Sequence, residues 1–325
     1  MPGRKLFLVI TVCLNIIFTA CNFQGISQKP DELNAVHEIE LTGTALAASG
    51  VLETPDFTLF TPTTVSITST PDATPIFTDH LPLAVVMIKE NEVLSLRSSP
   101  GENNHEIASL SSLAGNIVSK GNTQDFEGES WVEIQSPKGE TGWVKIGNLT
   151  EQVSSMEFCS DQRVTQLVDK FMNAIRVRNG KEFAQLISPR RGLIIRHEWW
   201  NPEVNFREPE MLENIFNDST TNNWGIENGS GQSINGSFKD VILPKIDDVQ
   251  EGSIRLCNSL EQGLASGGSA GFIRWPNEYA NFNYITIYRA APEGDELNWR
   301  TWVIGIEYVH GSPYIAILVQ YHWEI

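Results

Sequence analysis

The sequence predicts two folded domains of different classes, a small all-β barrel over residues 83–150 and an α+β domain over residues 156–325. The first segment contains short apolar runs with turn residues between them. The second contains one long amphipathic helix and, near the C-terminus, strand-like runs. In the α+β domain we therefore expect N-terminal helices packed on a curved antiparallel sheet.

The barrel is predicted from six short apolar runs that are separated by clusters of Gly, Asn, Ser and Pro. Short strands with turn residues between them are typical of small β barrels. The expected strands are residues 84–88, 93–96, 107–110, 116–120, 131–134 and 142–146. Pro100-Gly101 predicts a tight turn, and we expect Trp131 and Trp143 to fill the core.

Three local motifs in this segment resemble the bacterial SH3-like family. They are a Pro-Gly turn in residues 94–101 and tryptophan motifs in residues 130–134 and 139–144. Val132 stands where many members carry an aromatic residue that can line a ligand groove. Members of the family often bind cell-wall peptides or glycans, so the resemblance implies such a ligand for the barrel.

The clearest predicted helix covers residues 160–179, because its apolar residues form a single stripe. The stripe consists of Val164, Leu167, Val168, Phe171 and Ile175. Ser160 or Asp161 is expected to cap its start, and Asn179-Gly180 to end it in a left-handed turn. Two shorter helices are expected at residues 181–187 and 209–216.

Strands are expected in the C-terminal third of the chain, at residues 272–275, 284–288, 299–309 and 314–325. Residues 310–313 indicate a compact hairpin between the last two. In the final strand, alternate residues from Ile315 to Ile325 are apolar and would share the core face. The other face, which includes Gln320 and His322, is mixed in character.

Helices followed by a curved antiparallel sheet resemble the cone fold shared by nuclear transport factor 2 and scytalone dehydratase. Residues 223–231, 298–302 and 322–325 also look like an uncharacterised C-terminal domain that recurs in exported bacterial proteins. This second resemblance implies no activity. Cone folds often hold a central pocket, but we interpret the tryptophans of this domain as ordinary core.

The N-terminus indicates export followed by lipid anchoring. Arg4 and Lys5 precede an apolar run at residues 6–19, which is too short for an ordinary transmembrane helix. Residues 18–21 resemble the bacterial lipobox, so Cys21 would carry a diacylglyceryl group after removal of a signal peptide over residues 1–20. Plain secretion and an uncleaved anchor are the alternatives.

Residues 21–80 are expected to form a disordered tether. They are crowded with Thr, Ser and Pro, and no Lys or Arg occurs between Lys29 and Lys89. Such a segment cannot bury enough apolar surface to offset the entropy of ordering. It would therefore hold the folded domains away from the membrane.

The charge and the cysteines narrow the class of protein further. The formal net charge is -17, and it becomes -19 once the two basic residues of the signal peptide are removed. An acidic chain with no basic stretch is not expected to bind nucleic acid. Cys159 and Cys257 would remain beyond the lipobox, and we expect a disulfide between them, with two separate thiols as the alternative.

No motif predicts catalysis or a cofactor. Residues 267–271 match G-x-S-x-G, but Pro276 excludes the long helix that such a nucleophile needs, so we interpret them as a flexible loop. His197-Glu198 opens like a zinc-protease motif. Asn201 stands where the second histidine is required, so no metal site is expected there.

The sequence therefore predicts a lipid-anchored cell-envelope protein with a non-enzymatic binding or scaffold role. The anchor would lie in the outer membrane of a host with two membranes. Expected partners are the membrane, through the lipid, and peptidoglycan, through the barrel. Candidate ligand contacts are Arg97, Trp131, Trp143 and His322. The alternatives are a structural spacer and an envelope enzyme whose C-terminal pocket uses His322, His197 or Glu307 for acid–base work.

Overall fold

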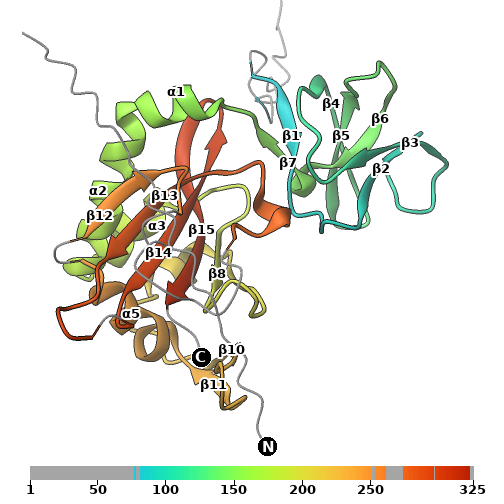
Figure 1. Ribbon diagram of the computed structural model, residues 1–325. Helices are drawn as coiled ribbons and strands as arrows, with labels where there is room; N and C mark the ends of the chain where they lie inside the picture. Colours follow the sequence, from blue (N-terminus) through green and yellow to red (C-terminus); the bar gives the residue numbers. More distant parts are fainter. Residues whose placement is uncertain (1–76, 78–80, 251–252, 261–273, 296, 323–325) are drawn as a thin grey trace, which may run out of the picture. The chain divides into compact units, whose positions relative to one another are not determined.

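The computed structural model describes residues 77, 81–250, 253–260, 274–295 and 297–322. These residues belong to one compact unit, a β-rich α+β fold in which strand outweighs helix (Figure 1). The predicted signal peptide, Cys21, the tether except for Phe77, and the loop at residues 267–271 lie outside the described residues. Within these ranges, no helix combines the length and the apolar character needed to cross a membrane.

Residues 83–151, which we call the barrel segment after the predicted fold, contain a five-stranded antiparallel sheet with the order β3-β2-β6-β5-β4, and a separate pair formed by β1 and β7. The strands are β1 (Leu83–Val85), β2 (Val93–Arg97), β3 (Glu106–Ser111), β4 (Val118–Phe126), β5 (Glu129–Gln135), β6 (Thr141–Lys145) and β7 (Leu149–Glu151). All six expected strands are present, β4 extends past its predicted end, and β7 was not predicted.

Aliphatic side chains, rather than the two tryptophans, fill the core of this segment. Val132 and Ile134 alternate along β5 and are fully buried in one cluster. Because successive strand residues point to opposite faces, Trp131 faces away from that cluster, although it is buried. Phe77, which the sequence places in the tether, is buried in the same cluster.

The helix predicted at residues 160–179 is α2 (Gln162–Arg176), and a separate short helix, α1 (Ser155–Ser160), precedes it. Asp161 lies between them and caps α2, because its carboxylate accepts a hydrogen bond from the Arg163 backbone N–H at 2.9 Å. All five residues of the predicted apolar stripe are buried. The amphipathic pattern is therefore confirmed, and the helix starts at one of the two predicted caps.

The turn after α2 is left-handed, as expected, but at a different residue. Arg178 adopts the positive φ of 57° instead of Asn179 or Gly180. Asn179 instead caps the next helix, α3 (Gly180–Leu186). Gly180 is needed there because an added Cβ would collide with the carbonyl oxygen of Glu213. The remaining α-helices of the described residues are α4 (Pro209–Glu213) and α5 (Leu243–Asp247).

A six-stranded sheet with the order β12-β13-β14-β15-β8-β9 forms the centre of the α+β part. Its strands are β8 (Leu193–Arg196), β9 (Val204–Phe206), β12 (Ile254–Cys257), β13 (Asn283–Arg289), β14 (Arg300–Val309) and β15 (Ser312–His322). A separate hairpin consists of β10 (Asn222–Ile226) and β11 (Ser233–Gly236). Residues 274 and 275, from the predicted strand at 272–275, are not in a strand.

The sheet is mixed, so the expectation of a purely antiparallel sheet is wrong. Strands β8 and β15 run parallel, with Leu318 opposite Ile195, and the other neighbours are antiparallel. The four-residue strand β8 was not predicted, because its apolar run is too short to be recognised without its partner. The chain between β8 and β15, which includes β9 to β14, provides the long connection that a parallel pair requires.

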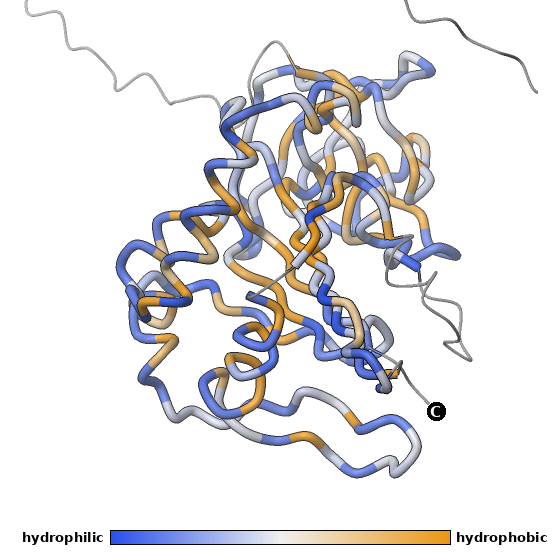
Figure 2. The backbone as a smooth tube through the Cα atoms, turned by 60° about the vertical axis from the view of Figure 1, so that its left-hand side comes forward, coloured by the Kyte–Doolittle hydropathy of each residue, from blue (hydrophilic) through white to orange (hydrophobic). Residues whose placement is uncertain are grey.

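Both faces of this sheet are buried, and a bulge in β15 explains why the predicted alternation holds from Ile317 to Tyr321 but fails at Ile315. Two consecutive residues of β14 pair with Ile315 and Ile317, which leaves Ala316 as an extra residue. Ile315 and Ile317 therefore pack in different core clusters, on opposite faces. The second face is also buried in the core at Leu318, and the polar residues Gln320 and His322 follow it toward the end of the strand. Figure 2 shows hydrophobic stretches that alternate with hydrophilic ones along the backbone.

The predicted hairpin between β14 and β15 is confirmed. His310 and Gly311 both adopt positive φ, of 51° and 68°, as a tight two-residue hairpin turn requires. The Glu151 carboxylate accepts hydrogen bonds from their two backbone N–H groups, at 3.1 and 2.8 Å. The end of β7 is thereby joined to this turn.

Cys159 of α1 and Cys257 of β12 form a disulfide, with 5.8 Å between their Cα atoms. The bond connects a helix to the edge strand of the sheet across a sequence separation of 98 residues.

Candidate functional site

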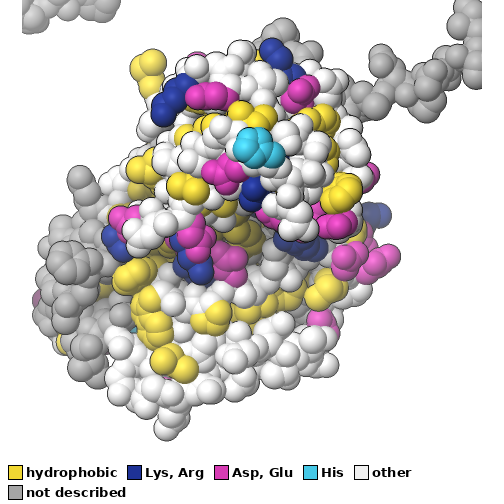
Figure 3. Space-filling view, turned by 90° about the vertical axis from the view of Figure 1, so that its right-hand side faces the viewer, with side chains coloured by type: hydrophobic (Ala, Val, Ile, Leu, Met, Phe, Trp, Pro, Cys, Tyr) yellow, Lys and Arg dark blue, Asp and Glu magenta, His cyan; other side chains and the backbone are white. Residues whose placement is uncertain are grey.

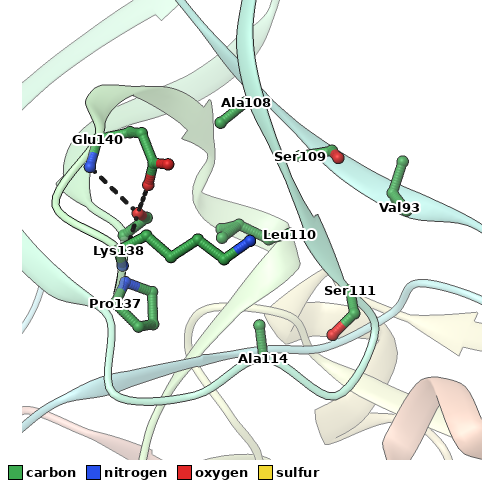
Figure 4. A pocket seen from close by; sticks show the side chains of 10 residues that line it. Val93, Ala108, Ser109, Leu110, Ser111, Ala114, Pro137, Lys138 and Glu140 are labelled. Carbon is green, nitrogen blue, oxygen red and sulfur yellow. Dashed lines mark hydrogen bonds between the residues drawn. The ribbon is translucent and has the colours of Figure 1, made fainter.

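A groove of about 470 Å³ lies beside the edge strand β3 of the barrel segment (Figure 4). One wall is formed by Ala108 to Ser111 of β3, and the other by the turn between β5 and β6. The lining residues are Val93, Ala108, Ser109, Leu110, Ser111, Ala114, Ser136, Pro137, Lys138 and Glu140. Both apolar and polar side chains therefore face the groove.

Hydrogen bonds fix the shape of the turn that forms the second wall. The Ser136 hydroxyl accepts from the backbone N–H groups of Lys138 and Glu140, at 3.1 and 3.2 Å, and donates to the Glu140 carboxylate. Gly139 adopts a φ of 97°, which favours glycine. The hydrogen bond from Ser136 holds the pKa of Glu140 below its usual value, so this carboxylate is ionised at neutral pH.

The groove offers a cation, an anion and hydroxyl groups at its edges. The Lys138 side chain extends across it toward Leu110, and the Glu140 carboxylate lies by the turn (Figure 4). Ser109 and Ser111 add hydroxyls on the opposite wall, while Leu110 lies between them. This arrangement suits a short extended chain with small side chains and its own charged groups.

Three predicted ligand contacts lie in the same segment but do not line the groove. Arg97 is held by its own segment, with Nη1 3.1 Å from the Asn104 carbonyl oxygen and ion pairs of 3.8 Å to Glu102 and Glu106. Trp131 is buried, and Trp143 is half-buried next to Arg97 in the strand register.

The charged side chains of the barrel face are mixed in sign. Figure 3 shows acidic and basic groups interspersed on the face that it presents, with hydrophobic side chains between them. A ligand on this face would therefore be recognised by local pairs of charges rather than by one extended charged surface.

A second polar cluster lies in the α+β part, where strands β8 and β15 end. The His322 ring, one of the predicted ligand contacts, has its Nδ1 2.5 Å from Glu198 Oε1. His197 Nδ1 lies 3.8 Å from the same oxygen, which is too far for a hydrogen bond. In the sequence, His197-Glu198 and His322 are two separate signals. Only the parallel pairing of β8 with β15 brings them together.

The members of this cluster differ in exposure. The side chains of His197 and Glu198 are 3% and 2% exposed, whereas that of His322 is 25% exposed. Burial, aided by the positive charge of Lys245 and by His322, lowers the pKa of His197 to about 4. Its imidazole is therefore neutral at physiological pH, and neither of its nitrogens has a hydrogen-bond partner among the described residues. Leaving such a polar group without a partner costs about 1–3 kcal/mol.

The loop that presents these groups is held in a strained form. Glu198 adopts a φ of 72°, which is uncommon for a residue other than glycine. Asn201, at the position where a zinc-protease motif would have histidine, donates to the carbonyl oxygens of His197 and Ile226 at 2.6 and 3.1 Å. It also accepts from the Ile226 N–H at 3.0 Å. The asparagine thus stabilises the loop, and no metal-binding cluster is found in the part of the chain that the structure describes.

Glu307, the third acid–base candidate, does not belong to this cluster. Its buried carboxylate pairs with Arg190 and Arg191 and accepts from the Ser188 hydroxyl at 2.6 Å. Burial opposes ionisation of Glu307, but these partners outweigh it and hold its pKa below the usual value. We interpret it as a structural group.

No family model, curated protein or solved structure matches this chain. The sequence alone does not indicate Lys138 or Glu140 as site residues. Ser136-Pro137-Lys138-Gly139-Glu140 reads as a solvated turn, and only its approach to β3 makes it one wall of a groove.

Proposed function

We propose that the chain is a lipid-anchored protein of the cell envelope whose barrel binds peptidoglycan without acting on it chemically. The lipobox-like sequence ending at Cys21 supports the anchor, and the composition of residues 21–80 supports a tether. The anchor would lie in the outer membrane of a host with two membranes, or on the outer face of a single membrane. The observation that carries the binding proposal is the groove of about 470 Å³ with Lys138 and Glu140 at its edge.

The chemistry of peptidoglycan stem peptides fits this groove. They are short, carry small side chains and end in carboxylates, and some carry a free amine. Lys138 would pair with a carboxylate and Glu140 with an amine, while Ser109 and Ser111 would bond to peptide groups. Each exposed ion pair contributes at most about 1 kcal/mol, so we expect modest affinity for one peptide and stronger retention on a polymer with many copies.

The test is co-sedimentation of the mature protein, kept soluble in detergent, with purified peptidoglycan at low salt. Lys138→Glu should reduce the bound fraction by up to about fivefold, the equivalent of about 1 kcal/mol. Lys170→Glu is the matched control, because it makes the same charge change on an exposed residue of α2. Failure of the wild-type protein to sediment, or equal loss in both variants, would refute binding at this groove.

A further inference from the structure

The groove of the barrel segment runs along the free edge of a strand. Its wall includes consecutive residues of β3, from Ala108 to Ser111. Because successive side chains of a strand point to opposite faces of the sheet, a groove that contacts consecutive residues follows the edge of the strand rather than one face. Strand β3 is the last in its sheet and pairs only with β2 among the described strands. Figure 4 shows the turn with Lys138 and Glu140 on the side of β3 opposite to Val93 of β2.

The pairing with β2 shows which backbone groups of β3 face the groove. In an antiparallel pair, residues whose N–H and C=O groups face the partner alternate with residues whose groups face away. The Ser98 N–H, just after β2, donates to the His105 carbonyl oxygen at 2.9 Å, so every second residue of β2 before it also faces β3. Ala108 and Leu110 lie opposite two of these residues. The residue between them, Ser109, therefore directs its N–H and C=O groups to the free edge.

Two further observations agree with this direction of Ser109. The bulge in the pair adds Ile107 to β3 and leaves the alternation of β2 intact. The Ser111 carbonyl oxygen accepts from the Ala114 N–H at 3.0 Å, outside the pair with β2, so Ser111 faces the same way as Ser109. The edge beside the groove thus offers the N–H and C=O groups of Ser109 and the N–H group of Ser111.

The opposite wall offers charged side chains rather than backbone groups. The turn satisfies its own backbone, because the Ser136 N–H donates to the Glu140 carbonyl oxygen at 2.8 Å and the Gly139 N–H donates to the Ser136 carbonyl oxygen at 2.9 Å. The N–H groups of Lys138 and Glu140 donate to the Ser136 hydroxyl. A ligand in the groove would therefore have main-chain partners on β3 and charged partners on the turn.

We propose that the groove binds an extended peptide as an added strand on the free edge of β3. This inference rests on the proposed function and specifies the part of peptidoglycan that the barrel recognises, which is the peptide and not the glycan. One extended residue of the ligand supplies the N–H and C=O groups that pair with Ser109, whereas a glycan strand has no peptide main chain. The terminal carboxylate of the peptide pairs with Lys138, which fixes the direction of the added strand.

Substitution at Ser109 tests the added strand. Proline has no N–H and is tolerated in an edge strand where that group faces away from the sheet, so Ser109→Pro blocks the free edge without breaking the pair with β2. Ser109→Ala removes only the hydroxyl. In co-sedimentation with peptidoglycan, Ser109→Pro should bind at least about fivefold more weakly than Ser109→Ala, because main-chain hydrogen bonds are lost. Thermal unfolding shows whether both variants are folded, and equal binding by two folded variants would overturn the added strand.

A second measurement uses the wild-type protein and needs no substitution. Hydrogen–deuterium exchange, read by mass spectrometry, compares the protein with and without N-acetyl-L-lysyl-D-alanyl-D-alanine, the α-linked end of a stem peptide. Exchange in β3 should slow when this probe is present, because its free N–H groups become hydrogen-bonded. Exchange in β4, the other edge strand of the sheet, is the control and should not change. Unchanged exchange in β3 would also overturn the added strand.

Competition separates this inference from the proposed function. The same peptide should displace the wild-type protein from intact peptidoglycan, and glycan strands freed of their peptides by an amidase should not. Displacement by the glycan strands alone would overturn peptide recognition but leave peptidoglycan binding intact. Failure of the wild-type protein to sediment with intact peptidoglycan would refute the proposed function itself.

Discussion

Arg191 and Glu307 meet through two hydrogen bonds inside the protein, with Nη2 2.8 Å from Oε1 and Nε 2.9 Å from Oε2. The same guanidinium donates to the carbonyl oxygens of Gly147 and Leu149, at 3.1 and 3.0 Å. One buried ion pair therefore connects β14 with the residues around the start of β7. This ion pair and its hydrogen bonds join the two segments that the sequence predicts as separate domains.

Glu307→Gln should lower the free energy of unfolding by about 3–5 kcal/mol, because it leaves the buried Arg191 and Arg190 without their counter-ion. Urea unfolding followed by tryptophan fluorescence measures the change. Glu210→Gln, an exposed acid in α4, is the control and should stay within about 0.5 kcal/mol of the wild type. A loss below about 1 kcal/mol would contradict the structural role of the pair.

His197 should make the protein less stable as the pH falls. Its pKa in the folded protein is about 4, below the ordinary value of 6.5, so between these values the unfolded chain binds a proton that the folded chain does not. Protonation of His197 should therefore lower the free energy of unfolding by up to about 3 kcal/mol as the pH falls from about 6.5 to about 4. Below about pH 4 both states bind the proton, so this contribution changes no further.

Urea unfolding at pH 7 and at pH 4 compares the wild type with His197→Gln. The variant should lose less stability than the wild type over this interval, and His105→Gln should follow the wild type. Equal pH dependence in all three proteins would show that His197 is not held neutral by its surroundings.

The disulfide between Cys159 and Cys257 should contribute up to about 4–5 kcal/mol, because it closes a loop of about a hundred residues in the unfolded chain. Mass spectrometry of a non-reduced digest should show the two cysteine peptides linked. Paired Cys159→Ser and Cys257→Ser substitutions should lower the melting temperature, and added reductant should then have no further effect. Two alkylated thiols in protein purified from the envelope would rule out the bond.

Cys21→Ala should abolish fatty-acid labelling, because the thiol is the proposed attachment atom. Metabolic labelling with palmitate in the native host measures this directly, with Cys13→Ala as the matched control in the predicted signal peptide. Label in the wild type and in the control, but not in Cys21→Ala, is the expected result. An unlabelled wild type would exclude the lipid anchor.

Local patterns predicted much of the fold where the residues that pair are close in sequence. The barrel strands follow from apolar runs and turn residues, the helix α2 from its stripe and cap, and the β14–β15 hairpin from a turn at His310-Gly311. The bulge at Ala316 could not be predicted in this way. It depends on the register between two strands, and strict alternation assigns Ile315 and Ile317 to one face.

The sequence by itself determined the elements that depend on neighbouring residues: the apolar runs, the helix stripe, the caps and the turns, together with the acidic charge. Only the tertiary structure decided which distant side chains meet. Lys138 and Glu140 form a groove because their turn approaches β3, and His322 meets Glu198 because β8 pairs in parallel with β15. The physical reason is that such contacts are set by strand order and register, which depend on the packing of the whole sheet rather than on any local pattern.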